Sequence, residues 1–328
     1  VLFVGQKFPV TERVQSGLSF GDMVRATLAS PLFLILLACM AITASLELGP
    51  NRWVPAVLEA GGIAGILVLA YINGLMAILR FFAGPVVHRL SPTGILVSSA
   101  VLSGAGLYWL SYAETAGMAF AAATVFAVGV CYFWPTMLGV TSERVPKSGA
   151  LGLALMGGMG MLAVGLVTLP LMGKFADQSL HERLLENPQQ SVAALEQVVA
   201  TYPPLAAVAK QPFKKETEDA VEKVRLVLAA AADGELPAET AGAMRAAVSN
   251  APKGDAADAA VDAVKAVLDP ADNYGGRMSF RKVAPFSLLI IIVFGVIYLR
   301  DRAAGGYKAE SLTADDSSAA EKNVSDTE

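Results

Sequence analysis

The sequence predicts an all-α integral membrane protein with six transmembrane helices, and two observations carry this prediction. Six long apolar runs alternate with charged clusters, and most runs reach the roughly 20 residues that a helix needs to cross about 30 Å of hydrocarbon. The composition agrees, because 54% of the residues are hydrophobic and only 16% are charged, outside the usual range of soluble domains. The runs cover approximately residues 31–50, 56–79, 93–113, 115–142, 148–173 and 283–299.

These runs divide the chain into five regions. Residues 1–30 form a polar cytoplasmic linker that ends in an amphipathic helix around residues 20–28, a kind of helix that lies along a membrane surface. Residues 31–173 hold the first five transmembrane helices. Residues 283–300 form the last one, which is short but almost wholly apolar. Residues 301–328 are a tail that is expected to be disordered, because it is too rich in Ser, Asp and Glu to bury a core.

Residues 174–282 form an insert of about 110 residues, far longer than an ordinary connection between helices. Apolar residues spaced i, i+3 and i+7 predict amphipathic helices within it, and prolines and glycines separate those helices. The two stripes are Val221, Val224 and Leu228, and Val261, Val264 and Leu268. We therefore expect a small helical domain.

Basic residues lie mostly on one set of loops, and the positive-inside rule places those loops and both termini in the cytoplasm. The insert is then extracytoplasmic. The chain begins without methionine and no signal peptide precedes the first run, so we expect a C-terminal fragment of a longer multi-pass protein. The bacterial inner membrane is the favoured location. The basic residues concerned are Arg80, Arg89, Arg144, Lys147, Arg300 and Arg302.

The sequence contains no pattern typical of an enzyme, a cofactor site or a metal site. Cys39 and Cys131 lie inside apolar runs and are expected to be packing residues. There is no Ser/His/Asp set, no His/Cys metal spacing and no phosphate-binding glycine loop. The net charge of −4 indicates no particular partner, and no nucleic-acid partner is expected. Function has to be sought in the polar groups inside the apolar runs.

Glu47 is the first of these groups. A carboxylate near the membrane interior costs about 2.5–3.5 kcal/mol on insertion scales, so it needs a partner, a water-filled cavity or a proton. Gly49-Pro50 is expected to interrupt the helix shortly after it. Glu47 either contributes to a solute site or pairs with Arg52 at the outer membrane boundary, and the sequence leaves both open.

Other polar and aromatic side chains extend this candidate site. Asn73 stands out because an amide near mid-membrane must hydrogen-bond to a neighbouring helix or to a solute. Pro135 should kink the fourth helix and free a backbone carbonyl there. Polar groups beside aromatic rings suit a sugar-like ligand. The predicted substrate-binding residues are Thr43, Glu47, Asn51, Trp53, Asn73, Tyr132 and Trp134.

Two stretches resemble a known family. The loop Gly84-Pro85-Val86-Val87-His88-Arg89-Leu90-Ser91-Pro92 is similar to the G-x-x-x-D-R-x-G signature of the major facilitator superfamily, with His88 where that family usually has aspartate. Residues 133–146, beginning Phe133-Trp134-Pro135-Thr136, and the glycine-rich helix ending near Asp177 resemble the tenth and eleventh helices of its sugar permeases. The fucose/glucose-galactose branch is the most similar.

The resemblance implies that the six runs correspond to helices seven to twelve of a twelve-helix transporter, with the N-terminal six-helix half as partner. It implies alternating access, in which two bundles rock about a midplane site and move a small polar solute, a sugar being favoured and proton coupling one option. The gating residues that it implies are Gly84, His88, Arg89, Glu143, Arg144 and Asp177. The long insert departs from the family pattern.

The alternative is a membrane-anchored binding or sensor protein that acts through the 174–282 domain. The size of that domain favours some role for it. A simple anchor, however, needs one helix rather than six, and it needs no polar groups within the membrane.

Overall fold

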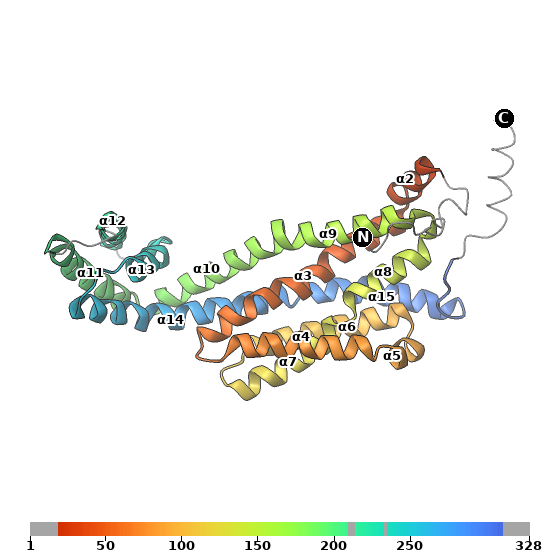
Figure 1. Ribbon diagram of the computed structural model, residues 1–328, viewed down its shortest axis with the longest axis horizontal. Helices are drawn as coiled ribbons and strands as arrows, with labels where there is room; N and C mark the ends of the chain where they lie inside the picture. The colour runs from red at the N-terminus through yellow and green to blue at the C-terminus, as the bar shows by residue number, and fades with distance from the viewer. Residues whose placement is uncertain (1–18, 209–213, 233–234, 311–328) are drawn as a thin grey trace, which may run out of the picture.

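The computed structural model describes residues 19–208, 214–232 and 235–310, and this part of the chain consists of helices and their connections, without a strand. The all-α class is thus confirmed for the described residues. Figure 1 shows a long bundle of helices with a smaller helical unit projecting from one end. The linker before residue 19 and the tail after residue 310 lie outside the described residues, so the expected disorder of the tail stays a prediction.

Five helical segments of the described chain are long and apolar enough to cross a membrane, which marks the protein as membrane-embedded. The sixth apolar helix, α4 (Gly65–Phe81), has 17 residues and is shorter than these five. The five segments are Pro31–Glu59, Pro92–Leu110, Ala116–Arg144, Pro146–Leu185 and Asp255–Ala303.

Helix α3 (Pro31–Glu59) is longer than the sequence indicates, because it continues through Pro50 and Pro55. The expectation that Gly49-Pro50 interrupts it is wrong. Each proline removes one helical hydrogen bond, but packing against neighbouring helices maintains such a segment in a membrane protein. A Cβ on Gly65, where α4 begins, would lie 2.3 Å from the carbonyl oxygen of Pro55, so the backbones of α3 and α4 touch there.

The fourth predicted run is divided between α7 (Ala116–Val130) and α8 (Phe133–Arg144). Between them, Cys131 and Tyr132 form a turn, four and three residues before Pro135. Pro135 cannot donate to the carbonyl of residue 131, which is the helical partner that its N–H would have had. The carbonyl is freed as predicted, and the fourth run is interrupted by a turn where the sequence predicts a kink.

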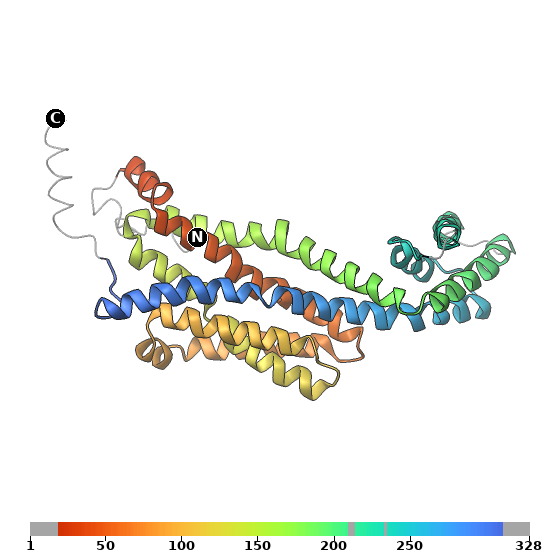
Figure 2. The same ribbon diagram turned by 180° about the vertical axis from the view of Figure 1, so that it is seen from behind.

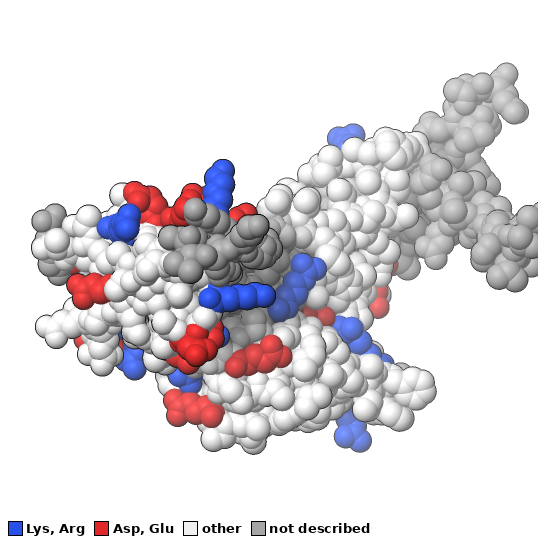
Figure 3. Space-filling model, turned by 60° about the vertical axis from the view of Figure 1, so that its left-hand side comes forward, with Lys and Arg blue, Asp and Glu red and all other residues white. Residues whose placement is uncertain are grey.

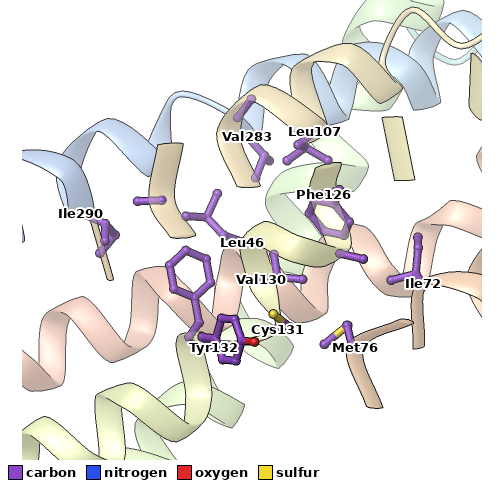
Figure 4. Packing of buried hydrophobic residues seen from close by; sticks show 14 of the residues in the cluster. Leu46, Ile72, Met76, Leu107, Phe126, Val130, Cys131, Tyr132, Val283 and Ile290 are labelled. Carbon is purple, nitrogen blue, oxygen red and sulfur yellow. The ribbon is translucent and has the colours of Figure 1, made fainter. Parts of the chain in front are cut away.

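The bundle has one apolar core, to which α3, α4, α6 (Pro92–Leu110), α7, α14 (Asp255–Val283) and α15 (Phe286–Ala303) all contribute. Figure 4 shows Leu46, Ile72, Phe126 and Ile290, from four of these helices, spread along this core. Helices α6 and α7 approach so closely that a Cβ on Gly129 would lie 2.2 Å from the backbone nitrogen of Ser103. Small residues permit this kind of contact in membrane helices. Cys39 and Cys131 are free thiols buried in this core, as expected.

Two long helical segments connect the bundle to the insert (Figures 1 and 2). One consists of the short turn η1 (Pro146–Ser148), α9 (Gly149–Leu162), the π-helix η2 (Ala163–Thr168) and α10 (Leu169–Leu185). The other is α14 followed by α15. Because α10 and α14 pack together and pass through positions 174 and 282, a helix pair rather than two loops joins the insert to the bundle.

The insert has its own core, formed by the ends of α10 and α14 with α11 (Pro188–Val208), α12 (Lys214–Ala231) and α13 (Thr240–Ser249). Val224 and Val264, one from each predicted stripe, are buried in it, so both amphipathic helices are confirmed. Figure 3 shows acidic and basic side chains interspersed over the insert, whereas the bundle surface in that view is mostly uncharged.

A short helix, α2 (Phe20–Leu28), precedes the bundle at the predicted position. It begins with a capping box. The Ser19 hydroxyl accepts the Asp22 backbone N–H at 3.1 Å, and the Asp22 carboxylate accepts the Ser19 backbone N–H at 3.3 Å.

Candidate functional site

An ion pair with a buried carboxylate and a half-exposed guanidinium lies in the apolar bundle. The Glu47 side chain on α3 is 5% exposed, and its Oε1 accepts a hydrogen bond of 2.9 Å from the guanidinium of Arg80 on α4. The second carboxylate oxygen, Oε2, is buried and has no hydrogen-bond partner among the described residues. A buried carboxylate ordinarily satisfies its acceptors, so Oε2 is an unusual unsatisfied acceptor in the described part of the bundle.

The break in the fourth run supplies the other partner of Arg80. The Nε of Arg80 donates to the carbonyl oxygen of Cys131 at 2.7 Å. This is the carbonyl that Pro135 leaves without a helical donor. One guanidinium therefore joins α3, α4 and the α7–α8 turn. Tyr132 adds a second link at the same turn, because its hydroxyl donates to the carbonyl oxygen of Leu79 at 3.0 Å.

A cavity of about 290 Å³ adjoins this network. Its wall is mostly apolar and comes from α4 to α6 and α8, with Arg80 and Glu143 as its charged members and Tyr132 and Thr136 as hydroxyl carriers. Few polar groups in an apolar wall are typical of small-molecule sites. The volume lies near the lower end of the roughly 300–1,000 Å³ of such sites, which suits a small solute.

The other predicted substrate-binding residues on α3 and α4 form a second polar contact. The Asn51 amide donates to Oδ1 of Asn73 at 3.1 Å, so these two predicted residues come together. The Oδ1 of Asn51 is buried without a partner among the described residues. Asn73 itself is exposed on the surface of the bundle, where an amide facing lipid would be costly.

Three predicted residues serve packing in this arrangement. Thr43 is buried and its hydroxyl donates to the carbonyl oxygen of Met40 at 3.2 Å. Trp53 and Trp134 are partly buried against the bundle core. The Trp134 ring lies close to Gly160 of α9, where a Cβ would come within 3.1 Å of it.

The predicted gating residues Glu143 and Arg144 lie in a polar network at the far end of the bundle from the insert (Figure 1). Arg144 pairs with Asp301 of α15 at 2.6 Å, and its guanidinium lies 4.4 Å from the ring centre of Tyr307. The Tyr307 hydroxyl donates to Glu143 at 2.7 Å. The end of α8 is thus joined to the end of α15 and to the segment that follows.

The remaining gating residues separate into two groups. Gly84, His88 and Arg89 belong to α5 (Gly84–Arg89), which borders the cavity through Val87, although the His88 side chain lies outside the described part. Asp177 lies on α10 near the insert, where its carboxylate accepts from Arg245 of α13 at 3.3 Å. Asp177 is therefore remote from the others.

Sequence reasoning missed Arg80, Asp301 and Tyr307. Arg80 was assigned to a loop because it follows an apolar run, yet it lies in the last turn of α4 and pairs with Glu47, so the Glu47–Arg52 alternative is wrong. The available signal was charge balance, since one buried carboxylate requires one cation that can reach it. Comparisons with family models, curated proteins and solved structures found no match.

Proposed function

We propose that this chain is one six-helix half of a secondary transporter that moves a small polar solute across a cell membrane by alternating access. The observation that carries the proposal is the pairing of the buried Glu47 with Arg80, which lines a cavity in the apolar bundle. Ionisable groups inside membrane bundles usually mark solute or proton pathways. A merely structural bundle has no need of a carboxylate with one unpartnered oxygen.

A sugar is the favoured solute class, because the cavity lining combines the hydroxyl of Thr136, the guanidinium of Arg80 and the carboxylate of Glu143 with the aromatic ring of Tyr132. The proposed partner is a second six-helix bundle, the N-terminal half of the same transporter. The exposed Asn73 and the half-exposed Arg80 support this, since both are better covered by protein or water than by lipid. The proposed location is the bacterial inner membrane, with both termini in the cytoplasm.

The test is uptake of labelled hexoses, deoxyhexoses and nucleosides by cells that express the complete reading frame, with and without a protonophore. Glu47→Gln should reduce uptake at least about tenfold while expression stays normal, since it removes the charge that Arg80 holds. Glu59→Gln is the matched control, because Glu59 is exposed at the end of the same helix. Equal uptake by both variants would remove Glu47 from the site.

A second candidate function, a sensor acting through the insert, is favoured by the separate core of that unit. Removing α11 to α13 and joining α10 to α14 by a short linker discriminates between the two. The α10–α14 pair would remain, so a transporter should retain measurable uptake. Complete loss of activity from a well-expressed deletion variant would favour the sensor.

A further inference from the structure

A second small cavity, of about 180 Å³, lies in the insert where α10, α11 and α14 meet. It is separate from the cavity in the bundle. One side is apolar and consists of Leu184 with the α14 residues Val267, Pro270 and Ala271. Its volume is below that of sites for drug-sized ligands, so only a small molecule fits.

The other side of this cavity is polar. Arg183, Asn187, Gln190 and Ser191 line it, from the end of α10 through the first turn of α11. Together they offer guanidinium and amide donors, amide acceptors and a hydroxyl that is both donor and acceptor. Ala266 of α14 also lines the cavity, and its carbonyl can receive no helical hydrogen bond from Pro270 four residues later.

Ser191 is the member that points to a ligand. Ser191 is 0% exposed, and its Oγ is buried without a hydrogen-bond partner among the described residues. A serine inside a helix can usually satisfy its hydroxyl on a carbonyl three or four residues earlier. Because an unsatisfied buried hydroxyl costs free energy, one that lines a cavity indicates a missing partner in that cavity.

The charge at the cavity selects the ligand class. The positive charge of Arg183 is balanced by an ion pair with Glu186, three residues later on the same stretch. The site therefore offers no net positive charge to an anion, but it keeps several uncharged donors and acceptors. A molecule with hydroxyls on its edge and C–H groups on one face matches a cavity that is polar on one side and apolar on the other.

We propose that the insert binds a small, neutral, hydroxyl-rich molecule, a monosaccharide or polyol, between Ser191 with its polar neighbours and the apolar face of α14. Such a site would give the insert a solute-binding role of its own. It does not depend on transport through the bundle, so it should survive the Glu47→Gln change.

The experiment is hydrogen exchange of the full chain in nanodiscs, with millimolar glucose, galactose, fucose, inositol or glycerol as probes, and with acetate and phosphate as anionic comparisons. We expect one hydroxylated probe to protect the peptides around residues 183–191 and 264–272. Ser191→Ala should lower the affinity for that probe about fivefold, as expected for the loss of one neutral hydrogen bond. Arg183→Gln should lower it about tenfold, as expected for the loss of one charged hydrogen bond. Ser249→Ala and Arg225→Gln, both at exposed positions of the insert, are the matched controls.

Ser191→Ala should fold normally, because the hydroxyl that it removes has no hydrogen-bond partner among the described residues. Protection by phosphate or acetate alone would overturn the neutral ligand class. Absence of protection by every probe, or equal affinity in Ser191→Ala and the Ser249→Ala control, would overturn the site.

Discussion

Arg80 is the residue on which the bundle site depends. The long side chain of Arg80 lets its charge reach from the last turn of α4 to the buried Glu47. Removing one partner of such a pair leaves the other charge uncompensated. The resulting loss of stability is usually larger than the net stability that the intact pair contributes.

We expect Arg80→Met to destabilise the protein by about 2 kcal/mol, less than for a fully buried pair because the Arg80 side chain is 41% exposed. The double variant Arg80→Met/Glu47→Leu should recover most of this loss, since no isolated charge remains. Unfolding in detergent measures both. Arg52→Met, at an exposed position of α3, is the control. A double variant less stable than Arg80→Met would contradict the pairing.

Tyr202 allows a prediction about pH. Its ring is fully buried in the insert and its hydroxyl donates to the carbonyl oxygen of Ala247 at 2.9 Å. Burial, aided by the negative charge of Asp258, raises the pKa of Tyr202 to about 12. The folded insert therefore holds this proton more tightly than the unfolded chain, whose tyrosine has a pKa near 10.

The contribution of this tyrosine to stability should be complete below about pH 10 and should be lost as pH rises toward about 12. Urea unfolding, followed by a fluorophore on Ser249→Cys, measures it. Tyr202→Phe should be less stable by about 1 kcal/mol at neutral pH, for the lost hydrogen bond, and should depend less on pH between 10 and 12. Identical pH dependence in the two proteins would contradict the assignment.

At the residue scale, the sequence predicted which positions are unusual better than it predicted their partners. Glu47 and Asn73 could be identified because polar groups in apolar runs are expensive. Their partners, Arg80 and Asn51, lie 33 and 22 residues away along the chain, and only the packing of α3 against α4 brings them into contact.

At the scale of elements, α3 packs against the π-helix η2, an irregular segment of the bundle. The Thr168 hydroxyl donates to Ser45 Oγ at 2.6 Å and also lies 3.1 Å from the carbonyl oxygen of Ala163. Gly49, two residues after Glu47, packs directly on Thr168, and a Cβ there would lie 2.7 Å from the Thr168 methyl group. π-helical turns are frequent at functional sites.

Gly49→Ala should therefore destabilise the protein by about 1–3 kcal/mol, the usual cost of overpacking, and should reduce uptake by shifting α3. Gly157→Ala is the matched control on α9, because nothing lies within 4 Å of its added Cβ. Adding Thr168→Ser removes the clashing methyl group and should restore stability. Equal thermal stability of the Gly49→Ala and Gly157→Ala proteins would contradict the close contact.

The prolines inside the apolar runs show how well the sequence predicts where helices are interrupted. Pro135 coincides with a break because Arg80 and the turn at Cys131 provide another partner for the freed carbonyl. Pro50 and Pro55 lie in an uninterrupted α3, since neighbouring helices hold that segment. The chemistry of proline is the same in each case, and only tertiary packing distinguishes them.

At the scale of the whole molecule, the apolar runs predicted a helical membrane bundle, and the amphipathic stripes predicted a helical insert. The sequence did not predict that the α10–α14 pair continues from one unit into the other, because charged residues after the fifth apolar run and before the sixth resemble loop segments. This helix pair places the insert at one end of the bundle (Figure 2).

That arrangement predicts a topology that chemical labelling can test. Cys39 and Cys131 are buried, so the native protein should react weakly with a membrane-impermeant maleimide. With basic residues at the bundle end that carries Arg144 and Arg302, the positive-inside rule places that end in the cytoplasm and the insert outside. Ser249→Cys, exposed on α13, should therefore label in intact spheroplasts, whereas Ala309→Cys, exposed after α15, should label only after lysis. Labelling of Ala309→Cys alone in intact spheroplasts would reverse the orientation, and labelling of both would mean that the two units do not lie on opposite sides of the bilayer.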